Sequence, residues 1–204
     1  MHRLAAADIP TEHGDFKMIT YGSDHSDYSP HIAMVTQDLD VESPVLVRIH
    51  SECITGDLFG SKRCDCGKQL DESLNRISNE GGVLIYLRQE GRGIGIVNKL
   101  KAYNLQDEGM DTAEANVALG YPIDQRSFEA AIEILKDLKI KSIKLLTNNP
   151  EKVNAVDTTE IEVITREKIV IPPCSENIKY LRTKQDDMGH ILNLEDPKVL
   201  KFQG

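Results

Sequence analysis

Apolar and polar positions form two kinds of pattern along the chain, and each pattern predicts one kind of element. Short, continuous apolar runs at 44–50, 83–87 and 143–147 have the length of strands. The first is rich in β-branched residues and follows a proline. Such runs, bounded by polar and glycine-rich segments, are typical of buried strands.

Other segments carry apolar residues at helical spacing. Leu70, Leu74 and Ile77 share one face of a predicted helix that ends at Gly81. The clearest amphipathic pattern covers 127–138. Further helices are predicted over 97–105, from an N-cap at 111, from 148–150 with a proline in the first turn, and near 177–190. Because strands and helices alternate, we expect an α/β or α+β fold, a mixed sheet covered by helices.

The chain has 204 residues, an ordinary length for one domain. We expect a single catalytic domain over 1–192 and a flexible tail over 193–204. An apolar content of 40% and a charged content of 28% are those of a globular protein. The longest apolar run is shorter than the roughly 20 residues of a membrane span, and the N-terminus lacks a secretion signal. We therefore expect a cytoplasmic protein with no membrane partner.

The formal charge of −9 argues against nucleic-acid binding, which needs a basic face. It still permits a local cationic cluster that binds an anionic small molecule. Four cysteines in a reducing compartment favour metal binding over disulfides.

Three cysteines are spaced as metal ligands. Cys53 follows a predicted strand, whereas Cys64 and Cys66 lie just before a helix. Gly67 permits a tight turn that directs both sulfurs at one ion, and a helix N-terminus favours thiolates. Three soft ligands without an obvious fourth favour an open catalytic Zn²⁺ site.

Other interpretations of the cysteines remain open. A structural zinc would need a fourth ligand, for which His50, Cys174 or a distant histidine is available. We expect Cys174 to be a free thiol. Because Zn²⁺ with three thiolates carries a charge of about −1, it acidifies water less than a three-histidine site does. A carboxylate base would help, and the candidates are Glu52, Glu90 and Asp124.

A glycine-rich segment at 90–95 fits neither common phosphate-loop motif. A plain turn would explain the glycines. However, Arg88 and Arg92 flank Glu90, and Lys99 and Lys101 follow closely, which makes the segment a candidate for phosphate binding.

Several motifs in one order resemble the GTP cyclohydrolase II family. They are the segments at 48–57, 63–67, 88–95, 102–107, 111–116 and 146–152. The resemblance covers most of the chain and implies the first committed step of riboflavin biosynthesis. In that reaction GTP loses C8 of guanine as formate and its outer phosphates as pyrophosphate. A diaminopyrimidinone ribosyl phosphate remains.

The resemblance also implies roles for individual residues. Zn²⁺ would be bound by Cys53, Cys64 and Cys66, and Mg²⁺ would accompany the triphosphate. Asp124 would be the proton acceptor, and Arg126 the nucleophile toward the α-phosphorus. The residues implied to contact GTP are Arg48, Ile49, His50, Ser51, Glu52, Gln69, Glu90, Gly91, Arg92, Thr112, Thr147 and Lys152.

Some of these roles have alternatives in residue chemistry. Guanidinium stays protonated, so for Arg126 the stabilisation of charge on the α-phosphate is a milder role than nucleophilic attack. Capping and surface charge would also explain Asp124 and Arg126. Tyr103 is a candidate proton donor to the departing ring nitrogen, and otherwise a packing residue on its helix.

Three functions are consistent with these features. The leading one is full GTP hydrolysis by a homodimer, a state that only the resemblance implies. With no second catalytic domain evident, we expect a stand-alone enzyme. A second is a related enzyme that stops at a formamide product or serves another pathway. The third is a zinc-stabilised protein that binds nucleotides or RNA, which the acidic composition disfavours.

Overall fold

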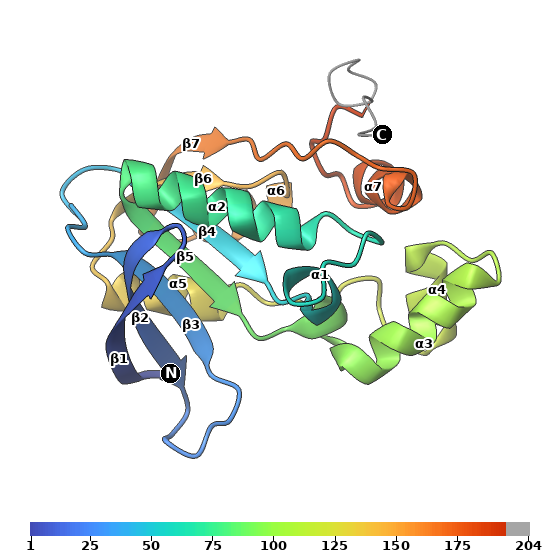
Figure 1. Cartoon of the computed structure of the whole chain (residues 1–204), viewed down its shortest axis with the longest axis horizontal. Helices are drawn as coiled ribbons and strands as arrows, with labels where there is room; N and C mark the ends of the chain where they lie inside the picture. Colours follow the sequence, from blue (N-terminus) through green and yellow to red (C-terminus); the bar gives the residue numbers. More distant parts are fainter. Residues whose placement is uncertain (195–204) are drawn as a thin grey trace. The chain divides into compact units, whose positions relative to one another are not determined.

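The computed structural model describes residues 1–194 and contains a seven-stranded mixed sheet with helices (Figure 1). The chain divides into two compact units. We call the first the sheet unit, which comprises Met1–His50, Leu70–Arg88 and Ser127–Ile169. We call the second the helical unit, which comprises Ser51–Gln69, Gln89–Arg126 and the chain from Val170 onward. Each unit is assembled from three separate stretches, and the domain limits of 1–192 stay a prediction.

The sheet has the order β1-β2-β3-β5-β4-β6-β7. The pairs β1–β2, β2–β3 and β3–β5 are antiparallel, whereas β4–β6 and β6–β7 are parallel. The strands are β1 (His2–Thr11), β2 (Gly14–Gly22), β3 (His31–Thr36), β4 (Val45–Ser51), β5 (Gly82–Leu87), β6 (Ser142–Leu146) and β7 (Glu162–Glu167).

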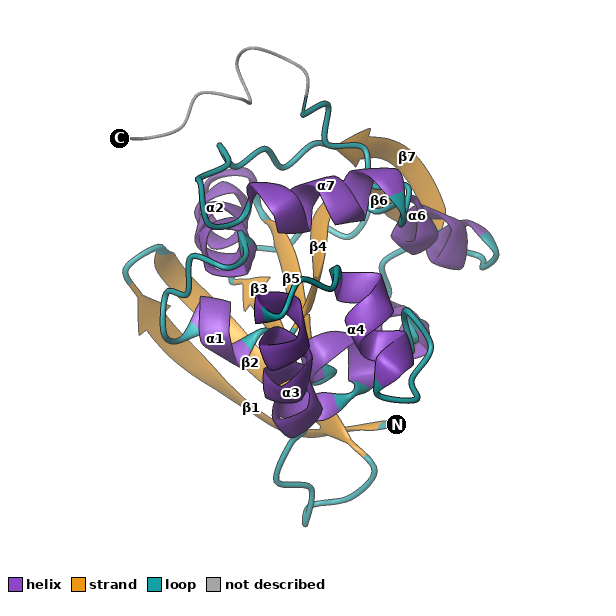
Figure 2. Ribbon diagram, turned by 90° about the vertical axis from the view of Figure 1, so that its right-hand side faces the viewer, coloured by secondary structure: helices purple, strands orange, loops and turns teal. Residues whose placement is uncertain are grey.

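Helices pack on both faces of this sheet. Neighbouring residues of a strand point to opposite faces, so Leu46 lies in one apolar cluster and Val47 in the other. The cluster with Leu46 includes residues of α2 (Cys66–Glu80), such as Ile77. The cluster with Val47 includes residues of α5 (Glu129–Asp137) and α6 (Pro150–Asp157). The predicted mixed sheet with covering helices is therefore confirmed (Figure 2).

The helical unit contains short helices and long connections. Its helices are α1 (Ile54–Asp57), the 3-10 turn η1 (Glu90–Gly93), α3 (Gly95–Asp107), α4 (Thr112–Ala118) and α7 (Ile178–Asp186). Asp111 begins α4 with a capping box, in which its carboxylate accepts from Ala113 and Glu114 while Glu114 accepts from the backbone of Asp111. The N-cap predicted at Asp111 is confirmed.

The chain after α7 packs back on this helix, because Leu194 is buried with Leu181. The rest of the predicted tail, 195–204, lies outside the described residues. Over residues 1–194, the helices are all too short or too polar to cross a membrane.

The sequence did not predict β1, β2, β3 and β7. The two edge strands are β1, which is alanine-rich and mostly exposed, and β7, whose residues are all exposed or half-buried. Such edge strands are set by pairing with a neighbour and leave little apolar pattern in the sequence.

Candidate metal centre

The thiols of Cys53, Cys64 and Cys66 converge in the helical unit. All three sulfurs lie within 4.8 Å of one another, and the Sγ atoms of Cys53 and Cys64 are 3.6 Å apart. Sulfurs bound to one tetrahedral Zn²⁺ at about 2.3 Å would be roughly 3.8 Å apart. Within the described residues, this group of ligand atoms consists of the three cysteines that the sequence indicated. The geometry is compatible with a zinc site.

Gly56 leaves room for the sulfurs. A Cβ atom at this position would lie 2.9 Å from the Sγ atom of Cys64 and 3.2 Å from that of Cys53. Real Cβ atoms essentially never come as close as the first of these distances. A side chain at Gly56 would therefore push the thiols apart.

Cys53 and Cys66 lie at helix starts, and Cys174 lies apart from them. Cys53 directly precedes α1, and its backbone N–H donates to the carboxylate of Asp57 at 2.9 Å. Cys66 begins α2, so the last two ligands flank Asp65 at a helix start. The Sγ atom of Cys174 instead donates to the backbone oxygen of Lys62 at 3.8 Å.

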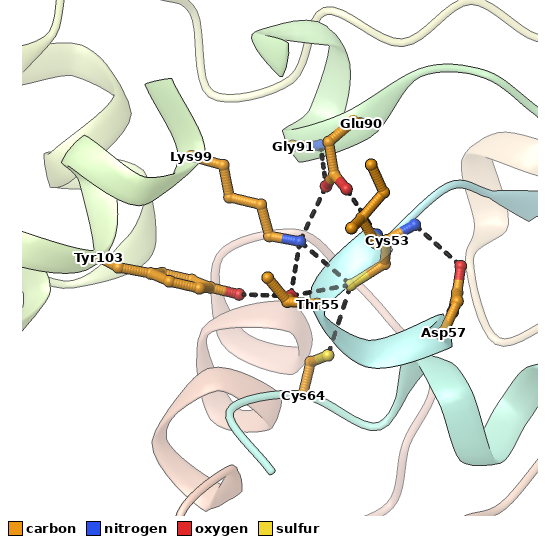
Figure 3. Close-up of polar contacts among 9 residues, drawn as sticks. Cys53, Thr55, Asp57, Cys64, Glu90, Gly91, Lys99 and Tyr103 are labelled. Carbon is orange, nitrogen blue, oxygen red and sulfur yellow. Dashed lines mark hydrogen bonds and ion pairs between the residues drawn. The ribbon is translucent and has the colours of Figure 1, made fainter. Parts of the chain in front are cut away.

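A buried cation contacts the sulfur of Cys53 (Figure 3). The Nζ atom of Lys99, on α3, donates to the Sγ atom of Cys53 at 3.1 Å. It also donates to the hydroxyl of Thr55 at 3.0 Å and to Oε1 of Glu90 at 2.8 Å. The other oxygen of Glu90 accepts from the backbone N–H of Ile54 at 2.6 Å. Glu90, a candidate base in the sequence, is thus engaged in holding α1 and Lys99.

This arrangement concentrates negative charge on one sulfur. Hydrogen bonds from Cys64 and Cys66, followed by the charge of Lys99, hold the pKa of the Cys53 thiol far below its usual range. The hydrogen bond with Cys53 raises the pKa of Cys64 to about 11. Burial would lower the pKa of Lys99, but the charges of Cys53 and Glu90 outweigh it and raise that pKa. The cluster therefore contains a thiolate paired with an ammonium ion.

A second cation, on the half-buried side chain of Lys184, supports the turn between the last two cysteines. The carboxylate of Asp65 accepts from Lys184 on α7 at 3.2 Å and from the amide of Gln69. Asp65 is 2% exposed. The ammonium of Lys184 also lies 4.4 Å from the ring centre of Tyr180. Burial would lower the pKa of Lys184, but the charge of Asp65 outweighs it and raises that pKa.

Tyr103 lies beside the same network. Its hydroxyl is 3.5 Å from that of Thr55, and its ring lies beneath two cations, Arg63 at 4.9 Å and Lys99 at 5.7 Å. Burial raises the pKa of Tyr103, so its phenol keeps a proton that it can donate.

The glycine-rich segment forms a strained turn. Gly91 and Arg92 both have a φ of 62°, a left-handed conformation that is costly for arginine. Within the described residues, both terminal nitrogens of Arg92 are buried and have no hydrogen-bond partner. A buried guanidinium in this state is suited to an anionic ligand.

Asp124 and Arg126 pair with each other in a two-residue turn. The carboxylate of Asp124 accepts from the backbone N–H of Arg126 at 2.9 Å and from its guanidinium. Burial would raise the pKa of Asp124, but Arg126 outweighs it and lowers that pKa, with a further contribution from the charge of Arg92. The backbone N–H of Gln125 donates to the oxygen of Arg92 at 3.1 Å, which joins this turn to η1.

Thr112 lines a cavity of about 330 Å³ within the helical unit. The cavity also borders Arg63, Asp107, Lys179 and Tyr180. Its walls therefore come from α3, α4, α7 and the loop that carries Cys64.

The sheet unit brings together another group of the expected GTP contacts. Arg48 donates to the backbone oxygen of Leu146 at 3.0 Å, next to Thr147. Lys152 donates to the backbone oxygen of Ile49 at 2.7 Å. The ring of His50 stacks on Tyr86 with 5.5 Å between centres. These residues lie near the C-terminal ends of β4 and β6, where ligands often bind in parallel sheets.

Sequence reasoning did not find the roles of Thr55, Asp65 and Lys184, and it grouped Lys99 with the phosphate-binding cations. Lys99 instead uses the three hydrogen-bond donors of its ammonium on Cys53, Thr55 and Glu90. Lys99 lies nine residues after Glu90 in the sequence, but only the fold of η1 and α3 shows that the two side chains meet.

The α/β fold and the three-thiol centre define a candidate metalloenzyme. The chain belongs to the GTP cyclohydrolase II family, because the family model of that description matches residues 2–168. The resemblance stated from the motifs is thus confirmed.

Similar proteins include riboflavin biosynthesis proteins RibBA of Bacillus species. One from Bacillus cereus is 52% identical over 193 residues, which are 94% of this chain and 48% of the relative. One from Bacillus cytotoxicus is 51% identical over 187 residues, which are 91% of this chain and 47% of the relative. The chain spans about half the length of these curated relatives.

A solved structure gives a weaker match. It is RibBX of A. baumannii, described as a two-domain 3,4-dihydroxy-2-butanone 4-phosphate synthase. The sequence identity is 21% and the TM-score 0.46, over 83% of this chain and 40% of that one. A likeness at this level carries no inference about the fold or the site.

Proposed function

We propose that this chain hydrolyses GTP, opening the imidazole ring of guanine and releasing formate and pyrophosphate. The product would be a diaminopyrimidinone ribosyl phosphate, the first intermediate of riboflavin biosynthesis. One observation carries the proposal, namely three sulfurs within 4.8 Å of one another in a chain of this family. When bound to Cys53, Cys64 and Cys66, Zn²⁺ would supply a Lewis acid that activates water for attack at C8.

Residues beside the thiols would supply the proton that ring opening requires. The departing ring nitrogen needs an acid, and Tyr103 keeps its phenolic proton because burial raises its pKa. The hydroxyl of Thr55 lies 3.5 Å from that phenol and would orient it.

Cationic and polar residues would bind the nucleotide. Arg92 has two buried nitrogens suited to phosphate oxygens, and Mg²⁺ would share the charge of the triphosphate. Gly91 would let the backbone approach the phosphates. The remaining proposed contacts in the helical unit are Ser51, Glu52, Gln69, Glu90 and Thr112, and those in the sheet unit are Arg48, Ile49, His50, Thr147 and Lys152.

Asp124 and Arg126 would act on the leaving phosphates. The pKa of Asp124 is lowered by Arg126, so its carboxylate is ionised at neutral pH, as a proton acceptor must be, and is a weak base while that pairing lasts. The same carboxylate holds the guanidinium of Arg126 as a cation. This favours charge stabilisation at the α-phosphate over nucleophilic attack, and a trapped phosphoramidate adduct would reverse that choice.

We further propose a cytoplasmic homodimer. Three thiols held for a metal must stay reduced, and the cytoplasm provides that condition. The homodimer rests on the family resemblance, and sedimentation of the purified chain would test it.

The direct test is incubation of zinc-loaded protein with GTP and Mg²⁺, followed by mass spectrometry of the products. Formate, pyrophosphate and the diaminopyrimidinone together would establish the activity. An accumulating formamide would restrict the chain to ring opening. Unchanged GTP from folded, metal-loaded protein would reject the proposal in favour of a binding protein.

A further inference from the structure

Lys99 is placed to modify a metal ligand directly. Its side chain is buried, and its three N–H groups are matched by three acceptors, the sulfur of Cys53 and the oxygens of Thr55 and Glu90 (Figure 3). An ammonium group has three donors and no acceptor, so none remains for a substrate phosphate. The ammonium is therefore committed to the thiol cluster.

Glu90 fixes the position of that ammonium. One carboxylate oxygen accepts from Lys99 at 2.8 Å and from the N–H of Gly91 at 2.7 Å. The other accepts from the N–H of Ile54, the residue that follows Cys53. One carboxylate thus holds both the cysteine backbone and the cation that contacts its sulfur. All these contacts lie within the helical unit, so they form one local hydrogen-bond network.

The hydrogen bond from Lys99 to Cys53 would affect the chemistry of a bound metal through the charge of the thiolates. Three thiolates bound to Zn²⁺ leave a net charge of about −1 and make the metal a weak Lewis acid. A thiolate has lone pairs to spare after binding a metal, and one of them can accept a hydrogen bond. A hydrogen bond from a cation draws electron density from the sulfur, and hydrogen bonds to a ligating cysteine tune metal centres in this way.

We propose that Lys99 is a positioning residue that donates a hydrogen bond to the zinc-bound thiolate of Cys53, and so restores Lewis acidity to a three-thiolate site. The inference rests on the zinc binding of the proposed function. Thr55 and Glu90 hold the ammonium in place, and Cys53 is the ligand whose electron donation is reduced. Cys64 and Cys66 remain the stronger donors.

The test uses cobalt, whose charge-transfer bands report the electron donation of each sulfur. Lys99→Met keeps a side chain of similar length without a donor. In the cobalt-loaded chain we expect its sulfur-to-cobalt bands to move to lower energy than in the wild type. In the zinc form we expect turnover per bound metal to fall about 10–100-fold. Lys99→Arg, which keeps an N–H donor, should recover part of the band shift.

Arg63→Met is the matched control. Arg63 also lies over the ring of Tyr103, at 4.9 Å, but its guanidinium donates to Asp107. Its removal takes a cation from the same neighbourhood without removing a hydrogen bond to sulfur. We expect wild-type cobalt bands. Equal shifts in both variants would mean a general effect of charge and overturn the proposal, as would unshifted bands in Lys99→Met.

A measurement on the wild type covers the case in which Lys99→Met does not fold. With an NMR-active cadmium isotope bound, an N–H···S hydrogen bond gives a scalar coupling between the metal and the lysine ammonium protons. We expect that coupling, whereas slowly exchanging ammonium protons without it would overturn the proposal. If the wild-type protein bound neither cobalt nor cadmium, the zinc site itself would be rejected. That outcome differs from bound cadmium without the coupling, which would reject only the role of Lys99.

Discussion

The apolar clusters of the sheet unit and the surroundings of the cysteines in the helical unit bury different chemistry. The clusters on the sheet are aliphatic and aromatic, with Val47, Ile85 and Leu145 fully buried. Around the cysteines of the helical unit, Lys99, Glu90 and Asp65 are buried, and the ammonium of Lys184, which pairs with Asp65, belongs to a half-buried side chain. Apolar contacts are roughly interchangeable if volume is kept, whereas a buried charge depends on its particular partners. The apolar clusters of the sheet unit should therefore tolerate change that the surroundings of the cysteines do not.

The largest effect should come from removing a metal ligand in the helical unit. We expect Cys66→Ser to lose zinc and to lower turnover at least about 10³-fold, because a metal Lewis acid supplies several kcal/mol and about 1.4 kcal/mol is tenfold in rate. Zinc content and product formation would be measured together. The matched control is Cys174→Ser, which should keep both, because that thiol contacts Lys62 instead of the cluster. Full zinc content in Cys66→Ser would remove this cysteine from the site.

Breaking one buried ion pair should have the next largest effect. Lys184→Met leaves the carboxylate of Asp65 buried without its cation, which we expect to cost about 3–5 kcal/mol in the free energy of unfolding. The double variant with Asp65→Asn should recover much of that loss, since no unpaired charge remains. Urea titrations of the wild type, both single variants and the double variant would give the coupling. Additive losses in the double variant would show that the two side chains act independently.

A deletion in the sheet core should cost about as much or less, but leave the metal centre intact. Leu145→Ala removes a fully buried side chain from β6, which we expect to lower the free energy of unfolding by about 2–5 kcal/mol. The folded fraction should still bind one zinc per chain. Ile164→Ala on β7 is the control, because that side chain is 44% exposed and should change stability by less than about 0.5 kcal/mol. Zinc loss in folded Leu145→Ala would show that the two units are coupled.

The same contrast explains what the sequence could predict. Continuous apolar runs located β4, β5 and β6, because strands buried on both faces are apolar throughout, and helical spacing of apolar residues located α2 and α5. The start of α6 was predicted from its proline. Cysteine spacing located the thiols, because their ligand chemistry is specific. The contacts of Lys99 and Lys184 left no such pattern. The residue type of a lysine does not show whether it is buried, and the carboxylate partner lies 9 residues away for Lys99 and 119 for Lys184.

The smallest effect should come from an exposed ion pair of the helical unit. Arg63 donates to both oxygens of Asp107 at 2.8 and 2.7 Å, with side chains 42% and 59% exposed. Water and salt screen such a pair, so we expect Asp107→Asn to leave the urea midpoint at its wild-type value at physiological ionic strength.

The sign of any residual contribution from this pair is fixed by the pKa of Asp107, which the hydrogen bond from Arg63 lowers. A lowered pKa means that the folded state binds the proton less tightly than the unfolded state. The contribution is therefore present above the unfolded pKa and is lost as the pH falls through the folded one. Comparing wild type with Asp107→Asn at neutral and acidic pH would measure it. If Asp107→Asn lowered the free energy of unfolding as much as Lys184→Met, the exposed pair Arg63–Asp107 would matter as much as the pair Lys184–Asp65. Burial would then not explain which charges the helical unit depends on.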